Sequence, residues 1–199
     1  EKHSYSSGYA GPKWVAEKII SNAIDKGLPA QIIRLGLITG DGAIGKMPAT
    51  QWFPQLLKLC HDIQAYPEGY NVYPTPVDFV ARSIYRLSCG KETTETYFHL
   101  ANPAAMPLDH FFADAATPKV PIGDWLNKLN QLPGSSQIAT LIWHAFNLRP
   151  GADYSHLRSI PEKKNLVSSE HTLNTLRKMN ISLPPVKSFA GKYLQGLLK

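Results

Sequence analysis

Apolar residues recur with helical periodicity near the start of the chain. From residue 14 to residue 24, apolar pairs appear every three to four positions and are separated by polar and charged side chains. The pattern predicts an amphipathic helix that stops at Gly27-Leu28-Pro29, because glycine and proline are typical of helix ends. The apolar run 31–35 then predicts a strand that leads, through residues 36–40, into a glycine-rich loop, as in a βαβ-type sheet.

Two kinds of organisation follow one another along the rest of the chain. Up to residue 103, the pattern predicts helices over 52–60 and 77–88, an irregular segment between them, and a strand over 96–101. After residue 103, helical segments dominate, over 108–115, 122–131, 138–146, 171–179 and 189–198. The predicted fold class is therefore α/β, with the C-terminal part of a doubly wound Rossmann-type core at residues 1–103 and a mostly helical substrate-binding lobe at residues 104–199.

Tyr9 and Lys13 stand four residues apart at the start of the first predicted helix. That spacing places a phenol and an ammonium on one helix face, one turn apart. A neighbouring ammonium favours the phenolate and lowers the pKa of the phenol from its usual value of about 10. The pair is therefore a candidate proton donor for carbonyl reduction near neutral pH. Taken alone, the pattern favours an ordinary amphipathic pair near a helix start.

A second pattern, over residues 40–46, has the glycine spacing of a phosphate-binding P-loop and follows a predicted strand. Met47 stands where a P-loop needs a Ser or Thr hydroxyl for magnesium, and Pro48 interrupts the helix that should begin there. We therefore expect this loop to shape a pocket rather than to bind nucleotide phosphates.

The composition narrows the classes of function. The 21 basic and 15 acidic residues give a net charge of +6 with the charges dispersed, so we expect no nucleic-acid partner. Two cysteines and the lack of a signal peptide or a membrane-length apolar run predict a cytoplasmic protein with no membrane partner. The seven histidines show no His-x-x-x-His or Cys-x-x-Cys pairing, so we expect no metal site.

Five segments, in order, resemble one known family. They are Gly-Tyr-x-x-x-Lys-Trp-Val-Ala-Glu at 8–17, Arg-x-Gly-x-Ile-x-Gly-Asp at 34–41, Pro-Val-Asp-x-Val-Ala at 76–81, Tyr-Phe-His-Leu-Ala-Asn-Pro at 97–103, and Gly-Asp-Trp-Leu-Asn-Lys-Leu at 123–129. Together they are similar to the extended short-chain dehydrogenase/reductases. More narrowly, they resemble the thioester reductase domains of nonribosomal peptide synthases, polyketide synthases and carboxylic acid reductases. The chain departs from that family at Pro12, which usually is Ser, and at Leu35, which often is Pro.

The resemblance implies a function, a cofactor and a set of site residues. It implies that NADPH delivers a hydride to a thioester held on the phosphopantetheine arm of a carrier protein, which releases an aldehyde or an alcohol. Tyr9 would donate the proton together with an upstream Thr or Ser, and Lys13 would lower the Tyr9 pKa and bind the nicotinamide ribose. Leu35, Gly36 and Leu37 would run past the nicotinamide, with the absent side chain of Gly36 permitting close approach.

No Gly-x-x-Gly-x-x-Gly follows a strand anywhere in the chain, and in this family that phosphate-binding motif lies upstream of the tyrosine. We therefore expect the chain to be the C-terminal part of a larger domain, inactive alone, with the missing N-terminal half as a partner. Two alternatives stay open: an NAD(P)-dependent sugar-nucleotide epimerase or dehydratase on the same scaffold, and a non-redox domain that cyclises its substrate or binds the carrier protein. For an acyl chain, the apolar side chains of Phe111, Phe112, Ile122, Trp125 and Leu126 suggest a lining in the lobe.

Overall fold

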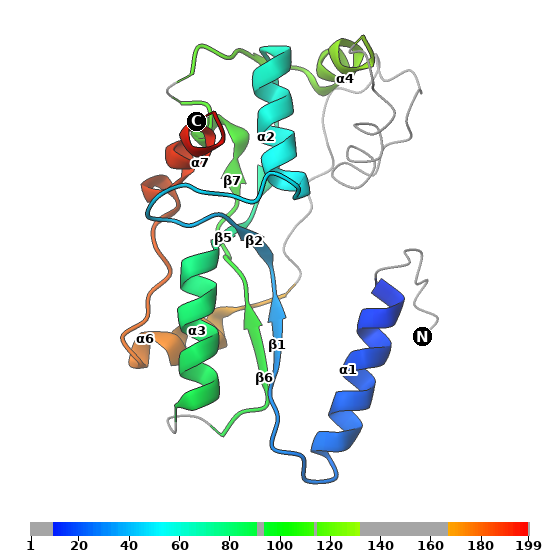
Figure 1. The fold of residues 1–199 in the computed structure, drawn as a ribbon, viewed down its shortest axis with the longest axis vertical. Helices are drawn as coiled ribbons and strands as arrows, with labels where there is room; N and C mark the ends of the chain where they lie inside the picture. Colours follow the sequence, from blue (N-terminus) through cyan, green and yellow to red (C-terminus); the bar gives the residue numbers. More distant parts are fainter. Residues whose placement is uncertain (1–9, 91–93, 114, 132–166, 199) are drawn as a thin grey trace.

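The computed structural model describes residues 10–90, 94–113, 115–131 and 167–198 (Figure 1). Its helices are α1 (Ala10–Ile24), α2 (Trp52–Ile63), α3 (Val77–Cys89), α4 (Ile122–Asn130), α6 (Glu170–Lys178) and α7 (Ala190–Leu197), with 3-10 turns η1 (Leu108–His110) and η2 (Val186–Ser188). Its strands are β1 (Ile32–Leu35), β2 (Leu37–Thr39), β3 (Tyr66–Pro67), β4 (Asn71–Val72), β5 (Pro74–Pro76), β6 (Tyr97–Leu100), β7 (Met106–Pro107) and β8 (Lys119–Val120).

The strands pair mostly in parallel. β1 pairs in parallel with β6, with Ile32 opposite Tyr97 and Leu35 opposite Leu100. β2 pairs in parallel with β5, and β3 with β8, whereas β4 and β7 are antiparallel. Parallel neighbours need crossover connections, and the chain between β2 and its partner β5 contains α2, while α3 lies between β5 and β6 along the chain. This combination of parallel strands and crossover helices agrees with the α/β class expected from the sequence.

Two apolar clusters hold these elements. The lobe cluster joins α2, α4 and α7 with the segments around β3, β4 and β7, and its largest buried side chains are Phe53, Phe111, Trp125, Phe189 and Tyr193. The sheet cluster joins α3, β6 and α6 through residues such as Phe79, Phe98 and Leu176. The lobe cluster takes in residues before position 103 and the sheet cluster takes in residues after it. As a domain boundary, position 103 stays a prediction.

Most helices lie where the sequence predicts them, but the helix expected over 108–115 is wrong. The described residues of that stretch form only the short turn η1. The apolar residues of this stretch do have helical spacing. The reason is that one side of an irregular turn packs inward and buries Leu108, Phe111 and Phe112. Phe112 stacks on Tyr66, with ring centroids 4.8 Å apart. The helix expected over 138–146 lies outside the described residues.

Two residues of the sequence motifs form buried hydrogen bonds that connect separate segments. Asn102, which follows β6, donates from Nδ2 to the Pro74 carbonyl at 2.8 Å, and its backbone amide donates to the Thr75 hydroxyl at 3.1 Å. The indole of Trp125 in α4 donates to the Ala65 carbonyl at 3.0 Å. Since buried polar groups need partners, these bonds explain both residue types without a ligand. Within the described residues, no helix is long and apolar enough to cross a membrane.

Candidate functional site

The helix that carries Lys13 lies beside the β1–β6 pair, which it contacts through Glu17 and Ser21. α1 begins at Ala10, so Pro12 falls in the first turn, where proline's missing N–H removes no helical hydrogen bond. Lys13 lies in that first turn with its side chain exposed. Tyr9 lies outside the described residues. α1 runs opposite to β1, so the end with Lys13 is at the carboxyl end of β1 (Figure 1), where open α/β sheets bind ligands.

A polar chain of contacts fixes α1 to the strands. Arg34 in β1 forms an ion pair with Glu17, and its Nε donates to the second Glu17 oxygen at 3.0 Å. From its other side, Arg34 Nη1 donates to His99 Nε2 in β6 at 2.5 Å. The hydrogen bond from Arg34 holds the pKa of the Glu17 carboxyl below its ordinary value, against a smaller opposing effect of burial. Because Lys13 is one helical turn from Glu17, this pair also sets the position of Lys13.

The strand carrying the predicted nicotinamide contacts is interrupted at Gly36. Leu35 ends β1 with 41% of its surface exposed, and Leu37 begins β2 half-buried against the lobe cluster. A Cβ on Gly36 would stand 2.7 Å from the Cβ of Ala101, so glycine is required there by the neighbouring chain. Packing against Ala101 therefore explains why position 36 is a glycine. Its role toward a cofactor stays a prediction.

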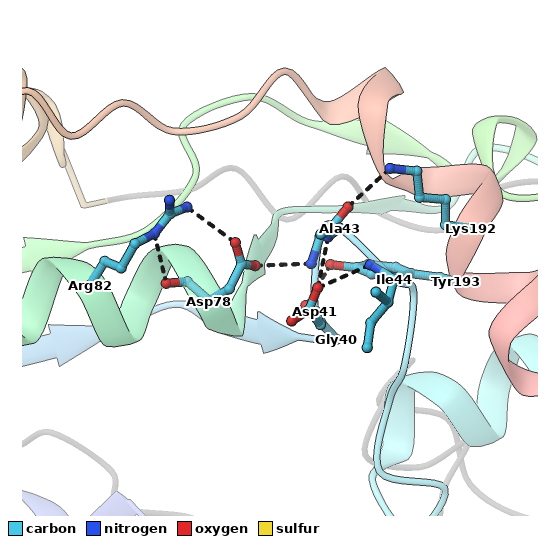
Figure 2. Close-up of polar contacts among 9 residues, drawn as sticks. Gly40, Asp41, Ala43, Ile44, Asp78, Arg82, Lys192 and Tyr193 are labelled. Atoms are coloured by element: carbon cyan, nitrogen blue, oxygen red, sulfur yellow. Dashed lines mark hydrogen bonds and ion pairs between the residues drawn. The ribbon is translucent and has the colours of Figure 1, made fainter.

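The glycine-rich loop after β2 is held from inside and from α3 (Figure 2). The Asp41 carboxylate accepts hydrogen bonds from the amides of Ala43 and Ile44, at 2.8 and 3.0 Å. Asp78, in the first turn of α3, accepts one from the Gly42 amide at 2.9 Å and pairs with Arg82. The Asp78 of the Pro-Val-Asp segment therefore has a direct structural task, which the sequence alone did not assign.

The backbone amides of residues 41–45 in the loop already donate hydrogen bonds within the protein. A P-loop binds phosphate through free N–H groups ahead of a helix. Here the amides of residues 42–44 donate to carboxylates, while those of Asp41 and Gly45 donate to the Lys46 and Asp41 carbonyls at 3.0 and 2.9 Å. No helix follows until Trp52. These bonds give the loop amides structural partners, and the expectation that the loop shapes a pocket stays a prediction.

Helix α7 also contacts the glycine-rich loop. The Tyr193 hydroxyl in α7 lies 2.9 Å from both the Gly40 carbonyl and the Thr39 hydroxyl. Burial raises the pKa of Tyr193, so its phenol stays protonated and donates. Gly45, at φ +76°, lies so close to α7 that a Cβ would stand 2.2 Å from the Lys192 carbonyl oxygen. Nothing in the local sequence pattern of the loop points to this long-range contact.

The apolar residues expected to line an acyl channel lie elsewhere. The five residues are between 0% and 3% exposed and form part of the lobe cluster: Phe111, Phe112, Ile122, Trp125 and Leu126. They pack on one another and on α2, so this expectation is wrong for the described structure. A run of apolar side chains looks the same in a sequence whether it faces a channel or a core. Among the described residues, no three His, Cys, Asp or Glu side chains gather as metal ligands would.

Comparison with known proteins identifies relatives of this chain. Residues 1–84 match the NAD-binding family described as male sterility protein. A glycine betaine reductase of Emericella nidulans is 32% identical over 126 residues, which make up 60% of this chain and 10% of that protein. The chain is thus similar to an NAD-binding family and to a reductase. Both agree with the class that the sequence motifs predict.

Two solved structures have similar folds. The terminal R domain from the myxalamid PKS-NRPS biosynthetic pathway superposes with a TM-score of 0.78 and 29% identity, covering 96% of this chain and 50% of that chain. An NAD-dependent NDP-hexosamine 5,6-dehydratase of tunicamycin biosynthesis gives a TM-score of 0.50 at 9% identity, which shows a shared fold alone. This chain spans half of that R domain and a tenth of the curated relative. The predicted fold class and the resemblance stated from the motifs are confirmed.

Proposed function

We propose a function on the premise that this chain belongs to the extended short-chain dehydrogenase/reductases, among the R domains of nonribosomal peptide and polyketide synthases. The proposed function is reductive release of a carrier-bound acyl thioester as an aldehyde or alcohol. In it, Tyr9 and Lys13 supply the acid–base chemistry. The cofactor phosphates would bind to a further segment, because the loop amides of residues 41–45 already donate within the described structure.

The described residues suit the nicotinamide end of such a cofactor. Exposed Leu35 and the adjacent Gly36 lie at the carboxyl end of β1, and α1 brings Lys13 toward the same end (Figure 1). NADPH, when bound, supplies the hydride that reduces the thioester carbonyl carbon. Lys13 would bind the ribose hydroxyls and favour the phenolate of Tyr9. Tyr9, with a Thr or Ser from the further segment, would hydrogen-bond the carbonyl oxygen and give it a proton.

The remaining steps follow from the substrate. The carbonyl carbon gains the hydride and its oxygen gains the Tyr9 proton, which gives a hemithioacetal. The carbon–sulfur bond then breaks, the thiol of the carrier arm leaves with a proton, and an aldehyde remains. A second reduction gives an alcohol. The partner in this proposal is a phosphopantetheinylated carrier protein, because its long arm presents a thioester to a separate domain.

One observation carries the proposal most directly: the ion pair of Glu17 with Arg34 fixes the Lys13 end of α1 beside the carboxyl end of β1. A carbonyl reductase needs this juxtaposition of acid–base helix and strand end. The sugar-nucleotide epimerase or dehydratase alternative shares the same scaffold, so the fold does not separate the two. The 32% identity to a reductase favours the reductase hypothesis over the epimerase or dehydratase.

The deciding experiment offers two substrate classes to the full-length protein. An acyl-pantetheine thioester and a panel of sugar nucleotides are each incubated with NADPH and, separately, with NADH. The proposal predicts cofactor oxidation with aldehyde formation from the thioester, with NADPH preferred. Turnover of a sugar nucleotide alone would support the alternative, and thioester release without cofactor oxidation would support the non-redox domain.

A further inference from the structure

The face of the β1–β6 pair that α1 contacts is polar. Side chains alternate along a strand, so Arg34 and the residue paired with it in β6, His99, lie on one face. Glu17 of α1 meets this face at Arg34, and Ser21 of α1 accepts from the Tyr97 hydroxyl at 3.1 Å. The opposite face is apolar and belongs to the sheet cluster. Since no residue of α1 is buried, we attribute its position on the strands to these polar contacts.

The guanidinium of Arg34 is held from two sides. Its Nε and Nη2 donate to the two oxygens of Glu17, and its Nη1 lies 2.5 Å from Nε2 of His99. A guanidinium is a rigid plane, so the two contacts together fix its orientation. The Arg34 and Glu17 side chains are 45% and 31% exposed, and an ion pair so exposed contributes little by itself, because ordering long side chains costs entropy. His99 supplies the second anchor that keeps Arg34 in place for Glu17.

This arrangement requires a neutral imidazole at position 99. Arginine stays charged and has only donors, so Nε2 of His99 accepts and the ring hydrogen is on Nδ1. Protonation removes the acceptor and places a second cation against Arg34. The backbone of His99 is held separately, because its amide donates to the Thr172 hydroxyl in α6 at 2.9 Å. A change of charge on the ring therefore acts on Arg34 first.

The groups around the His99 ring leave its charge uncompensated. Arg34 of β1 lies against it, and the Glu17 carboxylate of α1 lies beyond and already pairs with Arg34. α6 contacts the His99 backbone with the uncharged Thr172, and the neighbouring His171 forms an ion pair of its own. The charges of Arg34 and Glu17 balance each other, so a proton on His99 gives this group one net positive charge.

We propose that neutral His99 is a positioning residue for the cofactor site. By accepting from Arg34, it keeps the ion pair with Glu17 in place, and this pair holds the end of α1 that carries Lys13. Protonation of the ring releases that end and weakens cofactor binding. The inference rests on the proposed function for the role of Lys13 toward the nicotinamide ribose. Histidine is the side chain whose charge ordinarily changes between pH 5 and 8, so cofactor affinity should fall as the pH falls through that range.

Calorimetric titration of the full-length protein with NADPH, between about pH 5.5 and pH 8, tests this inference. His99→Leu lacks an acceptor and should weaken binding by about three- to tenfold at pH 8. His99→Gln has an amide oxygen that can accept from Arg34 but takes up no proton, so it should restore most of the affinity at pH 8. At about pH 5.5, the natural protein should have lost about three- to tenfold in affinity relative to His99→Gln. Comparing the two proteins at each pH cancels the titration of the cofactor itself.

His171→Gln is the matched control. It makes the same change on α6, where His171 pairs with Glu95 rather than with Arg34. Its affinity relative to the natural protein should be the same at every pH. Hydrogen exchange over residues 14–21 of α1 provides a readout without cofactor, and at one fixed pH the exchange should be faster in His99→Leu than in the natural protein.

Three results would overturn the inference. One is an affinity ratio between the natural protein and His99→Gln that stays constant across the pH range. Another is a His99→Gln protein that binds as weakly as His99→Leu at pH 8, because the acceptor would then not be the property that matters. The third is unchanged exchange over α1 in His99→Leu. A protein that binds NADPH with this pH dependence but reduces no thioester would leave the inference intact and remove the proposed function, whereas a natural protein that binds no nicotinamide cofactor would overturn both.

Discussion

The Tyr193 hydroxyl donates a 2.9 Å hydrogen bond to the Gly40 carbonyl, although 153 residues separate them in sequence. Tyr193 is fully buried in α7, and Gly40 directly follows β2 at the start of the glycine-rich loop (Figure 2). The loop next to the candidate site is therefore held in place by the far end of the chain. Its conformation depends on α7 as much as on its own glycines.

Tyr193→Phe should destabilise the protein by about 1–3 kcal/mol, because the Gly40 carbonyl and the Thr39 hydroxyl lose a buried partner. Chemical denaturation measures this difference. Tyr85→Phe is the control, since the Tyr85 ring is exposed, and its effect should be within about 0.5 kcal/mol. Equal effects of the two substitutions would contradict the assigned role of Tyr193.

Gly45→Ala and Gly69→Ala separate backbone strain from packing. Both glycines have positive φ, +76° and +73°, so each alanine adopts an unfavourable conformation that costs about 1–2 kcal/mol. Only at Gly45 would the new Cβ meet the Lys192 carbonyl, whereas nothing lies within 4 Å at Gly69. Gly45→Ala should therefore cost about 1–3 kcal/mol more than Gly69→Ala. Similar losses in thermal unfolding would mean that α7 does not press on the loop.

The Glu17–Arg34 pair predicts a pH dependence of stability. The Glu17 pKa lies below its ordinary value of 4.5, because the folded protein favours the carboxylate. The pair therefore contributes stability above pH 4.5, and this contribution is lost as the pH falls through the lower, folded-state pKa. Glu17→Gln should cost no more than about 1 kcal/mol at pH 7, since the pair is partly exposed.

Unfolding measured between pH 3 and pH 7 checks this sign. The difference between the natural protein and Glu17→Gln should shrink toward zero at the acidic end. Asp62→Asn is a suitable control, because the Lys58–Asp62 pair is well exposed on α2 and should contribute little at any pH. A Glu17→Gln difference that stays constant across this range would contradict the assignment.

The sequence predicted the elements whose periodicity is long and regular. α3 was expected over 77–88 and spans Val77–Cys89, because its buried positions recur at helical spacing. The strands β2 and β5 were missed. Each has three residues and one contains two prolines, so neither shows the alternation that identifies a strand. Their pairing depends on contacts between distant segments, which local patterns do not contain.

The candidate site was predictable only in part. The helix carrying Lys13 and the strand ending at Leu35 follow from periodicity and motif. Arg34 as the partner of Glu17 was not predicted, because the pair joins a helix to a strand 17 residues later. Apolar composition also misled the acyl-channel expectation, since burial of Trp125 or Phe111 is decided by what packs on them. Tertiary contacts, not residue types, make these distinctions.

The central claim, that Tyr9 is the proton donor for thioester reduction, is tested most directly by Tyr9→Phe in the full-length protein. NADPH affinity and turnover are measured separately for this variant. The substitution removes only the phenolic hydroxyl, so NADPH affinity should barely change while aldehyde formation from an acyl-pantetheine thioester falls by about a hundredfold or more. Lys13→Ala should weaken both turnover and NADPH binding. Unchanged thioester-dependent NADPH oxidation by Tyr9→Phe would contradict the account.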